Sequence, residues 1–241
     1  IVDTGILEAL PAQDGLIIQR AGAGTANSAQ TTAMTHEQLA IALQAGFDAA
    51  ERAHAQQADI FIGGEMGIGN TTAATVLYCA LLGLDPASMT GAGTGLDATG
   101  IAHKTQVIET ILKRHASCGN DALAWLASAG GFEIAALTSA YLRAAQLGLP
   151  ILLDGFITTA AAVVALKLQP AIQDWLFLSH ASAERGHKQA ISALGLQPLL
   201  DLNLRLGEGS GAAIAVPILR QACILHNQMA TFAEAAVAGK L

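Results

Sequence analysis

Short, uniformly apolar runs alternate along the chain with longer stretches whose apolar residues recur at helical spacing. The short runs predict β-strands, and apolar residues at i, i+3, i+4 and i+7 predict amphipathic helices. We therefore expect strands at residues 16–19, 59–62, 150–153, 175–178 and 198–202. Helices are expected at residues 35–57, 71–82, 101–112, 121–129, 132–147, 156–168, 187–194 and 214–238.

Polar and glycine residues mark several of the expected helix ends. Thr35 and Gln38 have the spacing of a capping box, which predicts the start of the first long helix. Asn70 is a favourable N-cap for the helix that follows it, and Gly83 is a typical terminator of that helix.

The alternation of strands and helices indicates the fold class. Strands that are apolar throughout, separated by helices, are typical of a parallel sheet that is covered on both faces. We therefore expect an α/β fold with a doubly wound, mostly parallel, Rossmann-like sheet. In such sheets ligands bind outside the carboxyl ends of the strands. Glu65, Asp154, residues 179–182 and Glu208 all follow expected strands, so they should gather at that edge.

Composition narrows the range of partners. Of the 241 residues, 52% are hydrophobic and 13% are charged, and the low charge suggests a large buried surface in the fold or in an oligomer. The net charge of −7 argues against nucleic acid as a partner. The apolar runs at 156–166 and 210–219 are too short to cross a membrane, so no membrane partner is expected.

Cysteine usage and the first residues bear on the compartment and on the boundaries of the chain. Cys79, Cys118 and Cys223 have no disulfide or C-x-x-C spacing, which indicates reduced thiols and a cytoplasmic protein. The chain does not begin with Met, and its first residues resemble the middle of a protein, so we expect a fragment or a processed chain.

Two carboxylates stand between glycines, a setting that lets a ligand approach the backbone closely. Glu208 lies within residues 204–211 (LRLGEGSG), and Glu65 lies within residues 60–72 (IFIGGEMGIGNTT). These patterns suggest an acid or a base in a small-molecule site. The alternatives are structural: Glu208 could accept backbone N–H bonds in its own loop, and Glu65 could cap a helix.

A further glycine-rich loop, residues 91–97 (GAGTGLD), is a candidate phosphate site. It should offer free backbone N–H groups near a helix start, and Lys104 could add a positive charge. The alternatives are a tight structural loop and a solvated lysine. Ser182 could bind a phosphate, since no G-x-S-x-G elbow supports a nucleophile, and His180 is expected to be a satisfied, partly buried histidine. The histidines lack metal-binding spacing, so no metal site is expected.

Several of these motifs occur together in a fixed order: residues 64–72 (GEMGIGNTT), 91–97 (GAGTGLD), 153–156 (LDGF), 179–184 (SHASAE) and 204–211 (LRLGEGSG). As a set they resemble the nicotinate-nucleotide–dimethylbenzimidazole phosphoribosyltransferases, which make the nucleotide of the cobalamin lower ligand. The resemblance covers essentially the whole chain. Any single loop would be weak evidence, whereas the ordered set is specific.

The resemblance implies roles for particular residues. Glu208 occupies the position of the general base, and Glu65 lies on the benzimidazole and ribose side of the pocket. Gly93, Lys104, Ser182 and the glycines after Glu208 belong to the side that holds the nucleotide phosphate. The implied substrate-binding residues are Glu65, Gly67, Gly93, Thr94, Gly95, Lys104, Asp154, Ser182, Arg205, Leu206, Gly207, Gly209 and Gly211.

The resemblance also implies an architecture and an assembly. It gives a nucleotide-binding α/β domain at residues 1–213 and, at 214–241, the C-terminal helices of a small helical domain. It further implies a homodimer, no cofactor, and an additional N-terminal segment that completes the benzimidazole pocket.

The implied chemistry suits these residue types. The pyridinium of nicotinate mononucleotide is a cationic leaving group on C1′, and the acceptor ring must lose a proton as it attacks. A buried carboxylate can take that proton, because burial raises its pKa toward the working pH. No pyrophosphate departs, so the reaction requires no Mg²⁺ to neutralise one.

Two other function classes remain open. A dinucleotide-dependent oxidoreductase should have an acidic residue about 20 residues after the first glycine of its loop. After Gly91 that position is Ile111, within an expected helix, which makes this class weak. A non-catalytic nucleotide-binding paralogue of the same fold is the other alternative, and the presence of Glu208 between its glycines argues against it.

Overall fold

A four-stranded parallel sheet forms the centre of the computed structural model, which describes residues 1–236. Its strands lie side by side in chain order: β3 (Phe61–Ile62), β4 (Ile151–Leu153), β5 (Leu176–His180) and β6 (Pro198–Leu200). Ile62, Leu152 and Phe177 pair across the sheet and share one face. The side chains of Ile151 and Leu153 point to the opposite face because successive strand residues alternate.

Helices make up most of the remaining chain. They are α1 (His36–Ala55), α2 (Thr71–Leu82), α3 (Pro86–Met89), α4 (Ala98–Arg114), α5 (Ala122–Ala129), α6 (Phe132–Gln146), α7 (Phe156–Leu168), α8 (His187–Leu194) and α9 (Ser210–Gln228). Of two 3₁₀ segments in the described chain, η1 (Ala116–Cys118) lies between α4 and α5, and η2 (Pro170–Trp175) lies between α7 and β5.

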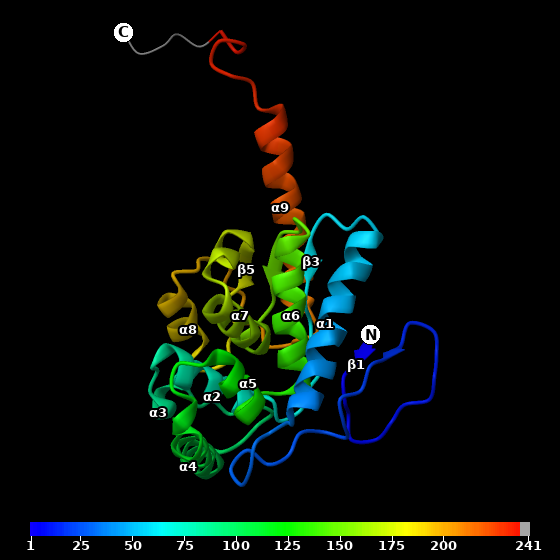
Figure 1. Ribbon diagram of the computed structural model, residues 1–241. Coiled ribbons are helices and arrows are strands. Elements are labelled where there is room, and N and C mark those ends of the chain that lie inside the picture. The colour runs from blue at the N-terminus through cyan, green and yellow to red at the C-terminus, as the bar shows by residue number, and fades with distance from the viewer. Residues whose placement is uncertain (237–241) are drawn as a thin grey trace.

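The two faces of the sheet are covered unequally. Crossovers between parallel strands are right-handed, so strands added in one direction leave their connecting helices on one face. There α6 and α7 pack on β4, and α1 packs on α6, around the main core that contains Ile151 and Leu153. The start of α9 packs on the opposite face, where Leu152 contacts a small cluster with Ala212 and Ala215. Figure 1 shows α9 leaving the body of the molecule beyond this contact.

Most of the expected elements are present, and the deviations have local causes. Thr35 and Gln38 form the expected capping box of α1. Asn70, however, makes no side-chain cap at α2: its backbone is already helical, with φ −70° and ψ −13°, and its Nδ2 donates to Glu65. The expected strand at 16–19 is present as β2 (Ile17–Ile18). It pairs only with β1 (Val2–Asp3), so it lies outside the central sheet.

The last helix differs from the expected range 214–238. It begins earlier, at Ser210, because the carboxylate of Asp154 accepts an N–H bond from its first turn. It ends at Gln228, and residues 237–238 of the expected range lie outside the described part of the chain.

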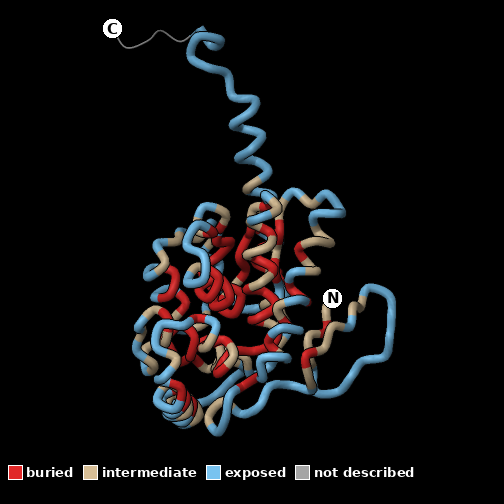
Figure 2. Tube along the Cα trace, in the orientation of Figure 1, coloured by how far each residue is buried: buried red, intermediate tan, exposed pale blue. Residues whose placement is uncertain are grey.

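Burial follows the same layout. Figure 2 shows buried residues concentrated in the sheet and in α6 and α7, whereas the outer part of α9 is exposed along its length. Several large apolar side chains of this segment are exposed, among them Ile218, Ile224 and Leu225. Within residues 1–236, no helix is both long enough and apolar enough to pass through a membrane.

Candidate active site

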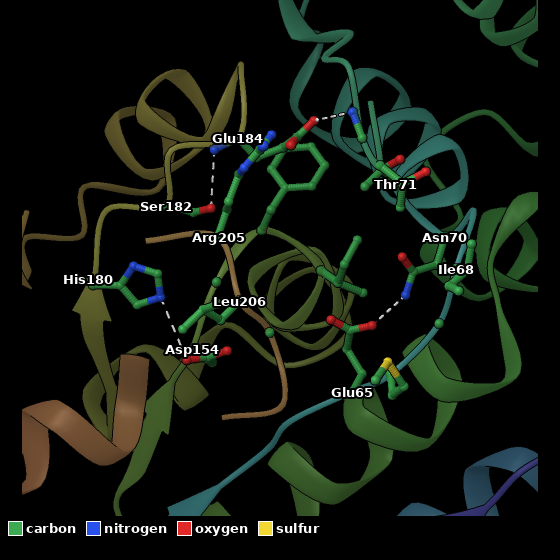
Figure 3. A pocket seen from close by; sticks show the side chains of 18 residues that line it. Glu65, Ile68, Asn70, Thr71, Asp154, His180, Ser182, Glu184, Arg205 and Leu206 are labelled. Atoms are coloured by element: carbon green, nitrogen blue, oxygen red, sulfur yellow. Dashed lines mark hydrogen bonds and ion pairs between the residues drawn. The ribbon is translucent and has the colours of Figure 1, made fainter. Parts of the chain in front are cut away.

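A cavity of about 410 Å³ opens at the carboxyl edge of the sheet. Its walls come from the loops after β3, β4 and β5, from the 91–97 loop, and from residues 205–207 before α9. Figure 3 shows Glu65 and Asn70 on one side of this cavity and His180 and Ser182 on the other. The expected gathering of polar residues at this edge is therefore present.

Glu65 is a partly buried carboxylate of the cavity, which Asp154 and Glu184 also line. Its Oε2 accepts a hydrogen bond from Asn70 Nδ2 at 2.5 Å. Burial raises the pKa of the Glu65 carboxyl, and the negative charges of Glu133 and Asp154 raise it further. Hydrogen bonds from Asn70 and from the Gly67 amide oppose this rise. The cavity thus holds a carboxylate with increased affinity for a proton.

Glu208 occupies a different environment from the one expected. Its side chain is exposed and does not line the cavity, so the buried setting expected for the general base is not found at Glu208, and Glu65 is the more buried of the two glutamates. The reason is the loop geometry: Gly207, Glu208 and Gly209 have φ values of 76°, 61° and 78°. A left-handed glutamate is unusual and strained, and such strain often occurs at functional positions.

Close packing fixes this loop against the Glu65 segment. The Glu208 N–H donates to the Glu65 carbonyl oxygen at 3.1 Å. Gly64 lies directly against the Glu208 backbone, and a methyl group there would overlap the Glu208 carbonyl. The backbones of the two glutamates are therefore in contact, although of the two side chains only that of Glu65 lines the cavity.

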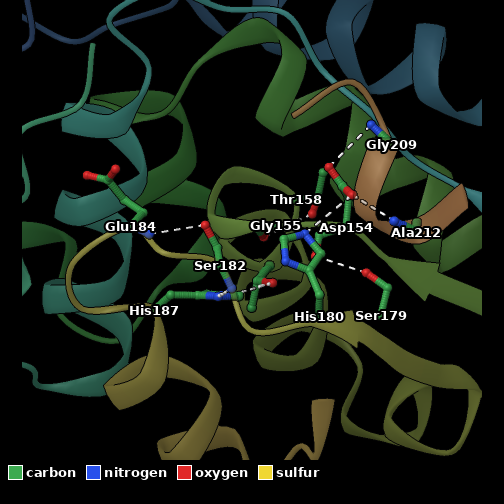
Figure 4. A network of polar contacts seen from close by, with 11 residues as sticks. Asp154, Gly155, Thr158, Ser179, His180, Ser182, Glu184, His187, Gly209 and Ala212 are labelled. Atoms are coloured by element: carbon green, nitrogen blue, oxygen red, sulfur yellow. Dashed lines mark hydrogen bonds and ion pairs between the residues drawn. The ribbon is translucent and has the colours of Figure 1, made fainter. Parts of the chain in front are cut away.

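The buried carboxylate of Asp154 accepts backbone hydrogen bonds from the start of α9. Its Oδ2 accepts the Gly209 N–H at 3.2 Å and its Oδ1 accepts the Ala212 N–H at 2.9 Å, as Figure 4 shows. A buried carboxylate in this position satisfies helix N-terminal donors and interacts favourably with the helix dipole. Asp154 therefore acts on the shape of the 207–209 loop as well as lining the cavity.

His180, the last residue of β5, is buried between Asp154 and α9. Its Nε2 lies 3.6 Å from Asp154 Oδ1, and Gly211 packs so closely that a methyl group there would overlap the imidazole. Its Nδ1 is buried and has no hydrogen-bond partner among the described residues. The expectation of a satisfied, partly buried histidine is therefore wrong, because His180 is fully buried and one ring nitrogen lacks a partner.

A second histidine, His187, holds the Ser182 loop. His187 Nδ1 accepts the Ser182 N–H at 2.8 Å, which leaves its Nε2 to donate to Thr159 Oγ1 at 3.1 Å. Burial lowers the pKa of His187 to about 3, and the nearby His180 contributes in the same direction. A neutral imidazole thus fixes the loop, and the Ser182 hydroxyl hydrogen remains free for a ligand.

The 91–97 loop is less open than expected. Gly93 N donates to Glu184 Oε1 at 3.4 Å, and Gly95 N donates to the Ala92 carbonyl at 3.1 Å. The expectation of several free N–H groups is therefore wrong in part, because the loop closes on itself. Lys104 is buried beneath it and donates to Thr71 Oγ1 at 2.8 Å. Burial lowers its pKa, and the Glu184 charge opposes this effect.

A better anion site on the cavity wall is the N-terminus of α7. Gly155 precedes this helix and provides no side-chain cap, and the first-turn residues Phe156 and Ile157 line the cavity. Uncapped helix N-termini attract phosphate through their N–H groups and dipole. Ser182 and Arg205 line the same cavity, so a hydroxyl and a guanidinium are available to the same anion.

The structure separates the sequence-derived site residues into two groups. Those that line the cavity are Glu65, Gly67, Gly93, Thr94, Asp154, Ser182, Arg205, Leu206 and Gly207. Those that do not are Gly95, Lys104, Glu208, Gly209 and Gly211. Gly209 and Gly211 instead support the loop through Asp154 and His180, as described above.

Some contributing residues were not singled out from the sequence. Glu184 and Thr71 belong to recognised motifs, but their side chains had no assigned role. His187 and Glu133 lie in ordinary helical patterns, and only their burial in the fold reveals them. Residues 1–236 contain no group of three or more His, Cys, Asp or Glu side chains arranged to hold a metal ion.

Comparisons with known proteins agree on a family. A family model described as phosphoribosyltransferase matches residues 1–237. The chain is 55% identical over 238 residues to the nicotinate-nucleotide–dimethylbenzimidazole phosphoribosyltransferase of Ectopseudomonas mendocina (strain ymp), covering 99% of the chain and 68% of that protein. The protein of the same name from Pseudomonas putida (strain KT2440) is 55% identical over 240 residues, covering 100% of the chain and 68% of that protein.

Solved structures give the same result. The crystal structure described as CobT from Thermus thermophilus aligns with a TM-score of 0.94 at 46% identity, over 99% of this chain and 71% of that one. A second structure of a phosphoribosyltransferase of this kind from the same organism aligns with a TM-score of 0.92 at 45% identity, over 99% and 70% of the two chains. The expected α/β fold class is confirmed by these alignments.

Proposed function

The chain belongs to the nicotinate-nucleotide–dimethylbenzimidazole phosphoribosyltransferase family, and on this premise we propose the reaction it performs and the roles of its residues. It transfers the phosphoribosyl group of nicotinate mononucleotide to 5,6-dimethylbenzimidazole or a related base. The products are nicotinate and α-ribazole 5′-phosphate for cobalamin nucleotide-loop assembly. The observation that carries this proposal is one cavity with the partly buried Glu65 carboxylate on one side and an uncapped helix N-terminus on the other.

The reaction needs no covalent intermediate. One acceptor ring nitrogen attacks C1′ on the face opposite nicotinate, the C1′–N bond to the pyridinium breaks, and nicotinate keeps the bonding electrons. The other ring nitrogen gives its proton to a carboxylate. Displacement from the opposite face inverts C1′, so a β-linked substrate gives an α-linked product. Positioning of the two reactants provides much of the acceleration.

The nucleotide phosphate binds at the Ser182 side of the cavity. Its partners are the first N–H groups of α7, the Ser182 hydroxyl and Arg205, and the Gly93–Thr94 loop closes this side with Lys104 beneath it. The acceptor occupies the Glu65 side, where exposed Met66, Ile68 and Leu206 provide apolar contacts for an aromatic ring.

We assign proton removal to Glu208 and acceptor positioning to Glu65. The resemblance and the strained left-handed backbone support the role of Glu208. The backbone hydrogen bond from Glu208 to Glu65 holds the two residues side by side, which supports their acting on the same acceptor. Glu65, which already lines the cavity, orients the acceptor or the ribose by accepting a hydrogen bond.

The assembly, compartment and domain division complete the proposal. We infer a cytoplasmic homodimer with an α/β domain at residues 1–213 and a small helical domain to which residues 214–241 contribute, of which residues 237–241 lie outside the described part of the chain. The exposed apolar side chains of α9 support an interface in this region.

An assay with the purified chain tests the proposed reaction. Incubation with nicotinate mononucleotide and dimethylbenzimidazole should release nicotinate only when both are present, as chromatography would detect. Release without the base would indicate a hydrolase. Nucleotide binding without any release would indicate a non-catalytic binding protein, and in both cases the proposal fails.

A further inference from the structure

The loop that carries Glu208 needs contacts that hold its shape. The φ of 61° at Glu208 is unfavourable for a residue with a side chain, so the surroundings must stabilise this conformation. The Glu208 side chain is exposed and lies outside the cavity walls. The conformation of the loop therefore decides where the Glu208 carboxylate lies relative to a bound acceptor.

Asp154 provides polar contacts directly after Glu208 in the chain. Its Oδ2 accepts the Gly209 N–H at 3.2 Å, and its Oδ1 accepts the Ala212 N–H at 2.9 Å. The carboxylate is buried, and within residues 1–236 no lysine or arginine lies within ion-pair distance of it. The basic side chain that does lie within this distance is His180.

His180 contacts both Asp154 and the first turn of α9. Its Nε2 is 3.6 Å from Asp154 Oδ1, which is longer than a direct hydrogen bond, so the attraction is electrostatic (Figure 4). Nε2 faces a carboxylate and so carries a hydrogen, which makes Nδ1 the bare acceptor of a neutral ring. Gly211 lies so close that a methyl group there would overlap the imidazole.

Packing alone does not explain a histidine at this position. The buried Nδ1 has no hydrogen-bond partner among the described residues, and an unsatisfied buried nitrogen is unfavourable. An apolar side chain would fill the same space without that cost. Other polar neighbours do not replace His180, because Ser179 Oγ donates to the Asp154 backbone carbonyl and both His187 nitrogens have other partners.

We propose that His180 is a positioning residue for Glu208. Its Nε2–H holds the Asp154 carboxylate in place, and that carboxylate fixes the Gly209 and Ala212 amides, which in turn fix the left-handed backbone of Glu208. The effect of His180 on turnover rests on the proposed function, whereas its effect on the loop does not.

Two substitutions of similar volume separate the N–H donor from the packing. His180→Gln keeps an N–H donor, because the glutamine amide nitrogen is about as many bonds from the main chain as Nε2. His180→Leu keeps the bulk and removes the donor. Leu178→Ala, at another buried position of β5, is the control for a destabilised strand.

Amide NMR of the substrate-free chain tests the loop directly. Amide protons bonded to a carboxylate resonate downfield, so the Gly209 and Ala212 resonances report on Asp154. His180→Leu should move both upfield, whereas His180→Gln should leave both near their wild-type positions. Leu178→Ala should lower the urea midpoint without moving either resonance.

Two NMR results would overturn the proposal. Unchanged Gly209 and Ala212 resonances in His180→Leu would show that the loop does not depend on His180. Equal shifts in the leucine and glutamine variants would show that the packing of the imidazole, and not its N–H, supports the loop.

The transferase assay tests the consequence for turnover. His180→Leu should lower kcat at least about tenfold, because a displaced base is poorly aligned with the acceptor. The KM for nicotinate mononucleotide should change less than about threefold, and His180→Gln should restore most of kcat. A raised KM with unchanged kcat would contradict a role in positioning Glu208.

Failure of this proposal is distinguishable from failure of the proposed function. If the wild-type chain releases no nicotinate in the presence of the base, the proposed function fails, and the amide resonances still decide whether His180 holds the loop. If the wild-type chain turns over and His180→Leu changes neither the resonances nor kcat, only the role of His180 fails.

Discussion

A backbone hydrogen bond joins Glu65 and Glu208, yet the Glu65 side chain lines the cavity and the Glu208 side chain is exposed. If Glu208 takes the proton, Glu208→Gln should lower kcat by at least about 100-fold, because general base catalysis contributes about that much. Nucleotide binding should remain, since the substitution keeps the size of the side chain. Steady-state kinetics and calorimetric binding of nicotinate mononucleotide measure the two effects.

Glu65→Gln is the matched comparison for that experiment. It should raise KM for the acceptor more than it lowers kcat, since Glu65 positions the acceptor and does not remove its proton. A Glu208→Gln enzyme with near wild-type kcat would remove Glu208 from the mechanism. If Glu65→Gln alone then showed the large loss, the base would be the buried carboxylate of the cavity.

Lys104 and Ser182 should act on the nucleotide. Lys104→Ala removes a buried ammonium beneath the Gly93 loop, and Ser182→Ala removes a hydroxyl at the cavity wall. Each should raise KM for nicotinate mononucleotide roughly tenfold with little change in kcat. This pattern is expected when the lost interaction is equally strong in the bound substrate and in the transition state. Lys113→Ala, at the exposed end of α4, is the control. A phosphate found in a crystal far from both Gly93 and Ser182 would contradict this assignment.

His187 should make stability depend on pH. Its pKa is about 3 in the folded chain and near 6.5 when unfolded, so between these values only the unfolded chain binds the proton. The free energy of unfolding should therefore fall as pH falls through this window, by up to about 1.4 kcal/mol per pH unit from this group. Urea unfolding between pH 7 and pH 4 measures the slope.

His187→Asn supplies the comparison, because an amide oxygen can replace Nδ1 as acceptor without taking a proton. The variant should lose stability less steeply with falling pH than wild type, whereas His54→Asn, on the exposed end of α1, should not change the slope. Glu65 and Glu133 have raised pKa values and act with the opposite sign, so the difference between variants is the informative quantity. Identical slopes in wild type and His187→Asn would disprove this role.

At the scale of elements, periodicity and caps located most helices and strands. The range of α8 and the end of α2 at Gly83 were predicted directly, because local signals decide them. The start of α9 was not, since it depends on Asp154, which is distant in sequence. The isolation of β2 from the central sheet depends equally on its pairing with β1. Long-range contacts thus explain the main errors.

The candidate site shows the same division. Glycine-flanked carboxylates and the carboxyl ends of strands pointed to Glu65 and Asp154 from sequence alone. The burial of Glu65 rather than Glu208 could not be predicted, because it depends on three consecutive positive φ values and on packing against Gly64.

At the scale of the whole molecule, the exposed apolar side chains of α9 predict association. Light scattering should give twice the mass of one chain. Replacing Ile224 and Leu225 by Asp should shift the protein toward the monomer, because buried carboxylates oppose an apolar interface. Gln221→Glu on the same helix is the control for added charge. A stable wild-type monomer at micromolar concentration would contradict the proposed dimer.

The most direct test of the whole account is the identity and anomeric form of the product. NMR of the reaction between nicotinate mononucleotide and dimethylbenzimidazole should show one α-ribazole 5′-phosphate formed for each nicotinate released, because attack opposite the leaving group inverts C1′. A β-linked product, or nicotinate release without a ribosylated base, would contradict the proposed displacement.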